Sequence, residues 1–173
     1  INCVTDDYCI GARAAISAEH LKKALDTLKH RGPDAEGKWQ DQHACLGHRR
    51  LSIVDTRARG NQPTEYGNLV IAFNGMIYNF CDIRQTLIQK GHKFHTETDT
   101  EVILAGWAEW QQDLLPRLHG MFAFALWDKT AKRLVLARDR FGKKPLFFRN
   151  WRDTFAFGSR FDAIEALTET AQL

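Results

Sequence analysis

The stretch that decides the fold is V-I-A-F-N-G-M-I-Y-N, residues 70–79. Its four apolar residues, 70–73, predict a buried strand. We expect this strand to end at Asn74 and Gly75, because both residue types tolerate turn geometry. Such an end presents a side-chain amide and a backbone N–H, which are the donors of an oxyanion hole. A hairpin turn is the usual alternative for Asn-Gly, but the residues that follow indicate a helix and no returning strand.

Composition limits the kinds of protein that this chain can be. Its 173 residues suit one domain with a sizeable core, and 44% hydrophobic with 26% charged residues is typical of a globular protein. The net charge of +3 is small and the basic residues cluster only at 138–144, so we expect no nucleic-acid partner. No apolar run is long enough to cross a membrane and no secretory signal is visible, so we expect no membrane partner.

The four cysteines, at positions 3, 9, 45 and 81, lack the C-x-x-C spacing of a metal site. Four thiols in a domain of this size favour a reducing compartment over a disulfide framework. We therefore expect a cytoplasmic protein without a metal site.

A loop rich in charge and in helix breakers precedes the central strand. It is H-R-G-P-D, residues 30–34, and it follows an amphipathic helix that Ser17 can cap. A buried Arg31 needs a carboxylate partner, and Asp34 can supply it. We therefore expect a structural ion pair in this loop.

Two adjacent arginines, Arg49 and Arg50, lie in an expected strand or strand pair over 44–54. Neighbouring side chains on a strand point to opposite faces, so one guanidinium can be solvated while the other enters a pocket. A guanidinium is the preferred partner of a carboxylate, because it binds both oxygens at once. The alternative, which the local sequence supports equally well, is that both arginines are surface residues.

The rest of the chain predicts further helices and a strand-rich last third. The expected elements are helices over 79–90, from 98 or 99 onward and over 161–173, a strand over 94–96, and hairpins over 121–137 and 145–157. Helix capping is the default role of Asp99. Parallel β-α-β units are not the theme, so the fold class is α+β with antiparallel sheets covered by helices.

Six motifs occur in the order in which one known family carries them. They are H-R-G-P-D at 30–34, H-R-R-L-S-I-V-D at 48–55, N-G-M-I-Y-N at 74–79, D-T-E at 99–101, G-M-F-A-F at 120–124 and A-R-D-R-F-G-K-K-P-L at 137–146. Together they resemble the class II glutamine amidotransferase domain of asparagine synthetase B-type proteins, over most of the chain.

The resemblance implies a fold, a reaction and partners. The fold is the N-terminal-nucleophile hydrolase αββα sandwich, with two stacked antiparallel sheets between helix layers. It makes residues 1–173 a single domain, either the N-terminal part of a larger synthetase or a stand-alone copy. The reaction is the hydrolysis of glutamine to glutamate and ammonia, without a cofactor. The ammonia passes to an ATP-dependent synthetase domain or subunit, and a homodimer is a further implication.

The family motifs also imply a role for individual residues. Cys3 stands in the place of the nucleophilic cysteine, whose own α-amine acts as the base. Asn74 and Gly75 would form the oxyanion hole. Arg50 would bind the α-carboxylate of glutamine, and Asp99 would bind its α-ammonium.

The sequence departs from the family at three places. Asn2 precedes Cys3, so the Cys3 nitrogen is a peptide nitrogen, and C-I-G at 9–11 is an alternative match to the family's Cys-Gly-Ile. Met76 replaces a glutamate that also binds the ammonium, and Arg160 replaces another glutamate. We therefore expect this chain to hydrolyse glutamine weakly or not at all. Two functions stay open: a glutaminase domain activated by processing, and a degenerate, non-catalytic domain with a structural or interaction role beside a synthetase.

Overall fold

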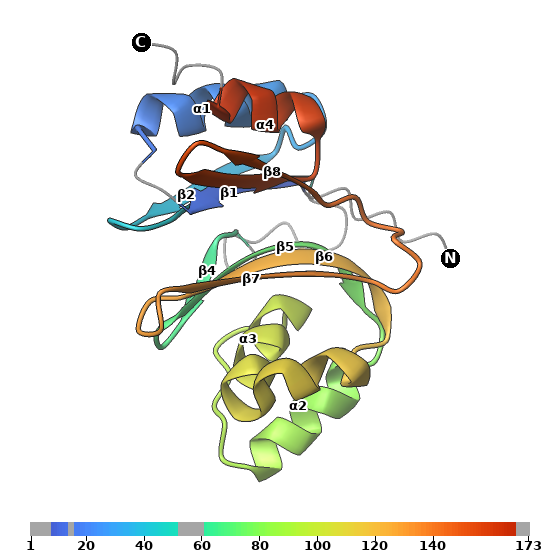
Figure 1. Cartoon of the computed structure of the whole chain (residues 1–173). Coiled ribbons are helices and arrows are strands. Elements are labelled where there is room, and N and C mark those ends of the chain that lie inside the picture. The colour runs from blue at the N-terminus through green and yellow to red at the C-terminus, as the bar shows by residue number, and fades with distance from the viewer. Residues whose placement is uncertain (1–7, 14–15, 52–60, 169–173) are drawn as a thin grey trace.

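The computed structural model describes residues 8–13, 16–51 and 61–168, and these form a four-layer sandwich. Two antiparallel sheets stack face to face, with α1 and α4 covering one outer face and α2 and α3 covering the other (Figure 1). The helices are α1 (Ala18–Thr27), α2 (Phe80–Gln89), α3 (Asp99–Trp110), the 3-10 helix η2 (Gln111–Arg117) and α4 (Phe161–Thr168). The predicted fold class, α+β with stacked antiparallel sheets between helix layers, is confirmed.

Both sheets are antiparallel throughout. The first has the order β2-β3-β1-β9-β8, built from β2 (Ala35–Gln40), β3 (Cys45–Arg50), β1 (Tyr8–Arg13), β9 (Thr154–Gly158) and β8 (Phe147–Trp151). The second has the order β4-β5-β6-β7, built from β4 (Thr64–Tyr66), β5 (Leu69–Ile77), β6 (Gly120–Asp128) and β7 (Arg133–Arg138). The two predicted hairpins are β6–β7 and β8–β9.

Three hydrophobic clusters hold the layers together, one between each pair of adjacent layers. Along β3, Cys45 packs on the helix side while Leu46 packs between the sheets, as strand alternation requires. β5 alternates in the same way: Ile71 faces the helices, and Val70 and Ala72 face the other sheet. This alternation decides which side chains of β3 and β5 can meet between the sheets. None of the described helices is long and apolar enough to cross a membrane.

The helices begin where the capping residues predict, and Thr98 rather than Asp99 is the cap of α3. Ser17 Oγ accepts a hydrogen bond from His20 N at 3.3 Å, so Ser17 caps α1 as predicted. Thr98 Oγ1 accepts from Glu101 N at 3.4 Å and caps α3. Asp99 is therefore the first residue of the helix and leaves its carboxylate for another partner.

The prediction that the central strand ends at Asn74 and Gly75 is wrong. β5 continues through both residues and stays paired with β6 up to Ile77. Gly75 has φ +144°, and a Cβ there would lie 2.2 Å from the Met121 carbonyl oxygen. The glycine thus serves a close approach between two strands, which the Asn-Gly pair alone did not distinguish from a turn.

Two other local predictions also fail. Residues 94–96 form no strand, because the Glu101 carboxylate accepts from the backbone N–H groups of His95 and Thr96 and replaces a partner strand. Arg31 and Asp34 are both exposed, so a buried ion pair in the loop is wrong. What the loop requires is Gly32, since a Cβ there would lie 2.6 Å from the Arg49 backbone carbon. The last predicted helix is present as α4, and residues 169–173 lie outside the described residues.

Candidate functional site

The candidate site lies along the edge of β5 that extends beyond β4. The β4–β5 pairing stops where Thr64 lies opposite Ile71, so among the described residues no strand pairs with β5 from Phe73 onward on that side. Side chains occupy this edge instead. Phe73 N–H donates to Gln62 Oε1 at 2.6 Å, and Ile77 N–H donates to Asp99 Oδ2 at 3.0 Å. Between these two contacts lie Asn74 and Gly75.

Asn74 is buried, with only 2% of its surface exposed. Among the described residues its Oδ1 atom has no hydrogen-bond partner. Strand alternation places its side chain with Val70 and Ala72, on the face between the sheets. A buried polar atom without a partner is uncommon and costs about 1–3 kcal/mol, which is typical of a position completed by a ligand or by water.

Arg50 approaches the same region from the other sheet. It is 9% exposed, and its Nη1 donates to Asn61 Oδ1 at 3.2 Å. His48, two residues earlier on β3 and on the same face, lies 3.3 Å from the carbonyl oxygen of Phe73 through its Nε2 atom. The β3 face that carries Arg50 therefore contacts β5 directly beside Asn74.

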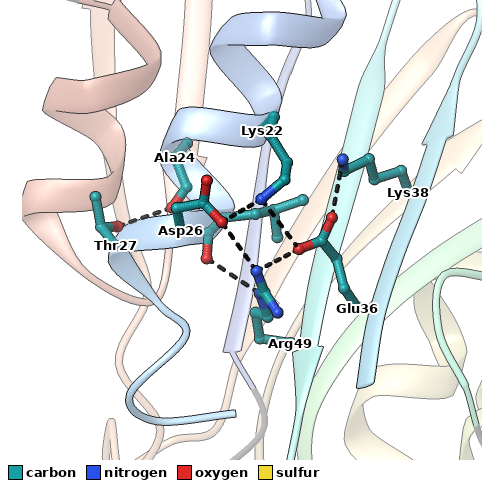
Figure 2. A network of polar contacts seen from close by, with 8 residues as sticks. Lys22, Ala24, Asp26, Thr27, Glu36, Lys38 and Arg49 are labelled. Carbon is teal, nitrogen blue, oxygen red and sulfur yellow. Dashed lines mark hydrogen bonds and ion pairs between the residues drawn. The ribbon is translucent and has the colours of Figure 1, made fainter. Parts of the chain in front are cut away.

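Arg49 points to the opposite face of β3, as the adjacent-arginine pattern predicts. There it donates to the Leu25 carbonyl oxygen at 3.1 Å and pairs with Asp26 and Glu36 (Figure 2). The expectation that one of the two arginines is solvated is wrong, since both are buried. Carboxylates from α1 and β2 compensate the charge of Arg49, which gives this side chain a structural role.

Asp99 combines a carboxylate with a helix N-terminus. Burial raises the pKa of Asp99 above its ordinary value, although backbone N–H groups of Ile77, Asp99 and Thr100 act to lower it. A cation placed beside this carboxylate would remove the charge penalty and lower the pKa. Met76, which occupies the position of the family glutamate, is half-buried opposite Met121 and contributes no charge.

The cysteines in the described part of the chain do not supply an N-terminal nucleophile. Cys9 is the second residue of β1, and its peptide N–H donates to Ser159 Oγ at 3.1 Å, with its thiol 3.4 Å from the same oxygen. Cys45 faces the helix layer, and burial raises the pKa of its thiol to about 11. Cys81 is exposed on α2. Cys3 lies outside the described residues, so its role stays a prediction.

Sequence reasoning assigned no role to His48 and missed Gln62 altogether. One signal was available for His48: a residue two positions before Arg50 on a strand shares its face. No local signal identifies Gln62, because its partner is a backbone N–H on a strand 11 residues away. Its importance follows only from the way in which β4 ends.

Two cavities elsewhere in the described residues are separate from this edge. A cavity of about 620 Å³ lies between η2, β6 and the loop after β7, and another of about 800 Å³ lies between β7 and the β8–β9 hairpin. Neither is lined by Arg50, Asn74, Gly75 or Asp99. No group of three or more potential metal ligands occurs in residues 8–13, 16–51 and 61–168.

Comparisons with known proteins show the family of this chain. The family described as the glutamine amidotransferase domain matches residues 9–172. Glutamine-hydrolyzing asparagine synthetase 3 of Bacillus subtilis strain 168 is 43% identical over 150 residues, covering 84% of this chain and 24% of that protein. A putative glutamine-hydrolyzing asparagine synthetase of Mycobacterium tuberculosis H37Rv is 42% identical over 149 residues, covering 79% of this chain and 23% of that protein. The chain thus spans about a quarter of the length of these relatives.

A solved structure supports the fold. Glutamine phosphoribosylpyrophosphate amidotransferase from B. subtilis superposes with a TM-score of 0.78 at 22% sequence identity, covering 92% of this chain and 43% of that chain. At this identity the likeness concerns the fold alone, which is the N-terminal-nucleophile hydrolase sandwich. The sequence match, the strand order and the conserved fold lead to one conclusion: the chain belongs to the glutamine amidotransferase domain family.

Proposed function

We propose that this domain binds L-glutamine at the free edge of β5 and hydrolyses it to glutamate and ammonia once Cys3 has a free α-amine. The observation that carries the proposal is the order of groups along that edge. Asn74 and Gly75 lie between the Gln62 contact to Phe73 and the Asp99 contact to Ile77, and Arg50 approaches from β3.

Each of these groups suits one part of glutamine. The Arg50 guanidinium can bind the α-carboxylate through two hydrogen bonds, and the Asp99 carboxylate can bind the α-ammonium. The Asn74 amide and a backbone N–H can stabilise the oxyanion that forms when a thiolate attacks the side-chain amide carbon. Ammonia leaves, and water then cleaves the thioester to give glutamate.

The Cys3 amine is the base that this reaction requires. A peptide nitrogen has no basic lone pair, so the thiol of an internal Cys3 lacks its proton acceptor. We propose that cleavage of the peptide bond before Cys3 completes the site, and that the ammonia is used by an ATP-dependent synthetase domain or subunit in the cytoplasm. The names of the relatives, which are glutamine-hydrolyzing asparagine synthetases, support this partner.

A second function is favoured by Met76. A thioether beside an ammonium supplies no charge, and loss of a charged hydrogen bond costs about 1.5–3 kcal/mol. A domain that no longer binds glutamine would keep a structural role beside the synthetase. Glutamine binding therefore separates the two functions.

Ammonia release from L-glutamine tests the proposal. The 173-residue chain, a chain trimmed to begin at Cys3, and the trimmed chain with Cys3→Ser are compared. We expect turnover only in the trimmed chain with its cysteine. Rapid turnover by the untrimmed chain would contradict the need for a free amine. Absence of both turnover and glutamine binding in the trimmed chain would establish the non-catalytic alternative.

A further inference from the structure

Phe73, the residue before Asn74, has both backbone polar groups held by side chains. Its N–H donates to Gln62 Oε1 at 2.6 Å, and its carbonyl oxygen accepts from His48 Nε2 at 3.3 Å. The β4–β5 register, continued past Thr64 opposite Ile71, would set Gln62 opposite Phe73. Pro63 lacks an N–H and cannot continue the ladder. The two side chains therefore supply the hydrogen bonds that a neighbouring strand would make to Phe73, the residue next to the proposed oxyanion hole.

Both side chains are well suited to fixing a backbone position. Gln62 is 5% exposed and His48 is 1% exposed, so water competes weakly for their hydrogen bonds. Burial, with a smaller contribution from the charge of Arg50, lowers the pKa of His48 to about 3, although the contact to the Phe73 carbonyl acts to raise it. The ring is therefore neutral at physiological pH. Because a carbonyl oxygen only accepts, the proton of the neutral ring lies on Nε2.

Asn61, the residue before Gln62, contacts Arg50, the proposed ligand of the α-carboxylate. Asn61 Oδ1 accepts from Arg50 Nη1 at 3.2 Å. Two consecutive residues thus contact the group assigned to the substrate carboxylate and the strand that carries Asn74.

The backbone of this dipeptide is itself fixed against the first sheet. A Cβ at Gly37 on β2 would lie 1.8 Å from the Gln62 carbonyl oxygen. Only glycine at position 37 allows this approach. The Gln62 backbone therefore lies directly against β2 of the first sheet.

We propose that Asn61 and Gln62 form a positioning element that sets Arg50 and Asn74 relative to one another. The proposal deepens the proposed function and rests on it for the identity of the substrate. Neither residue touches glutamine; each acts through its neighbour. The competing explanation is that Gln62 only covers a sheet edge and that Asn61 is a surface residue.

Nuclear magnetic resonance of the ligand-free 173-residue chain separates the two explanations. The variants are Gln62→Met, which removes the acceptor at similar length, and Gln62→Glu, which keeps an acceptor oxygen. Gln89→Met on the exposed face of α2 is the matched control. We expect Gln62→Met to speed hydrogen exchange at the Phe73 amide by about tenfold and to shift the Asn74 side-chain amide resonance. Gln62→Glu should restore both, and Gln89→Met should change neither.

Asn61→Ala provides an independent arm, because Asn61 is exposed and its replacement should not affect folding. We expect it to shift the Arg50 Nε resonance and also the Asn74 side-chain amide. An effect on Arg50 alone, or a Gln62→Met variant with an unchanged Asn74 resonance, would overturn the proposal.

L-glutamine titration of the same variants connects the element to function. Each single variant should weaken binding, and the double variant should weaken it by less than the product of the two effects. If the parent chain trimmed to Cys3 binds no glutamine, the proposed function fails. The ligand-free resonances still decide whether Asn61 and Gln62 position Arg50 and Asn74.

Discussion

The two faces of β3 use the same residue type for different purposes. On the helix side, Arg49 is surrounded by partners: the Leu25 carbonyl, Asp26 and Glu36 (Figure 2). On the side facing the other sheet, Arg50 donates to Asn61. On that same face His48 contacts the carbonyl oxygen of Phe73, the residue before Asn74, whose buried amide oxygen has no partner among the described residues. The difference teaches that Arg49 joins β3 to the helix layer, while Arg50 lies on the face of β3 that meets the proposed glutamine site.

The largest expected effect is a loss of stability from a residue of the proposed glutamine site. Gly75→Ala changes a residue of the proposed oxyanion hole. It should lower the free energy of unfolding by at least about 3 kcal/mol, because the new Cβ would lie 2.2 Å from the Met121 carbonyl oxygen. Gly67→Ala is the control: Gly67 has φ +58° and no neighbour within 4 Å, so its cost should be about 1 kcal/mol. Urea denaturation measures both. Equal losses would show that backbone strain alone, and not the strand approach, explains Gly75.

Loss of Arg50 should weaken glutamine binding. Arg50→Met should weaken L-glutamine binding about 100-fold, since charge-assisted hydrogen bonds to the carboxylate are worth about 1.5–3 kcal/mol each. Calorimetry on the chain trimmed to Cys3 measures the affinity. An equal loss of affinity in Arg49→Met would remove the distinction between the two faces.

Loss of Arg49 should lower stability and leave glutamine binding unchanged. Arg49→Met should lower the free energy of unfolding by about 2 kcal/mol, somewhat less than for a fully buried pair, because Asp26 is half-exposed and Glu36 keeps Lys38 as a partner. Glutamine affinity should not change. Lys38→Met, which removes one exposed partner of Glu36, should cost less than about 0.5 kcal/mol. Similar losses in the two variants would mean that Arg49 is not the centre of the network.

Met76→Glu should strengthen glutamine binding, because it adds a second carboxylate for the α-ammonium. We expect about tenfold tighter glutamine binding, equivalent to about 1.4 kcal/mol. Met121→Glu, which adds a charge directly opposite on β6, is the control and should not tighten binding. Equal effects would indicate general attraction of a cation and not a specific subsite.

The smallest expected effect is a pH dependence of binding. Because burial raises the pKa of Asp99 and the ammonium would lower it, glutamine binding releases a proton at pH values below the raised pKa. Affinity should therefore fall as the pH decreases, beginning above about 4, the ordinary range of an aspartate. For the unliganded fold the sign is reversed: a raised carboxyl pKa lowers stability as the pH rises past it. Asp99→Asn should bind weakly with an affinity that no longer follows pH between 4 and 7.

Much of the fold followed from sequence patterns because they reflect local physics. Ser17 predicted a helix start, and alternation predicted that Arg49 and Arg50 would diverge. The failures were non-local. Whether Asn74-Gly75 ends a strand depends on Met121 of the partner strand, and whether 94–96 forms a strand depends on the Glu101 carboxylate.

The candidate site was predicted only as a set of residues. The motifs supplied Arg50, Asn74, Gly75 and Asp99, but they did not indicate that one strand edge arranges three of them. Gln62 could not be found from sequence, since its role depends on where the β4–β5 ladder stops. Gln62 acts through a backbone N–H, which carries no side-chain signature.

The central claim is that Arg50, Asn74, Gly75 and Asp99 form a single glutamine site. Titration of the ¹⁵N-labelled chain, trimmed to begin at Cys3 and carrying Cys3→Ser to prevent turnover, tests it most directly. L-glutamine should shift the Arg50 Nε, Asn74 Nδ2 and Ile77 N resonances together with one dissociation constant, the last reporting on Asp99. D-glutamine, with its ammonium and carboxylate exchanged, should bind more weakly. Saturation by L-glutamine with any of these three resonances unmoved would contradict the claim.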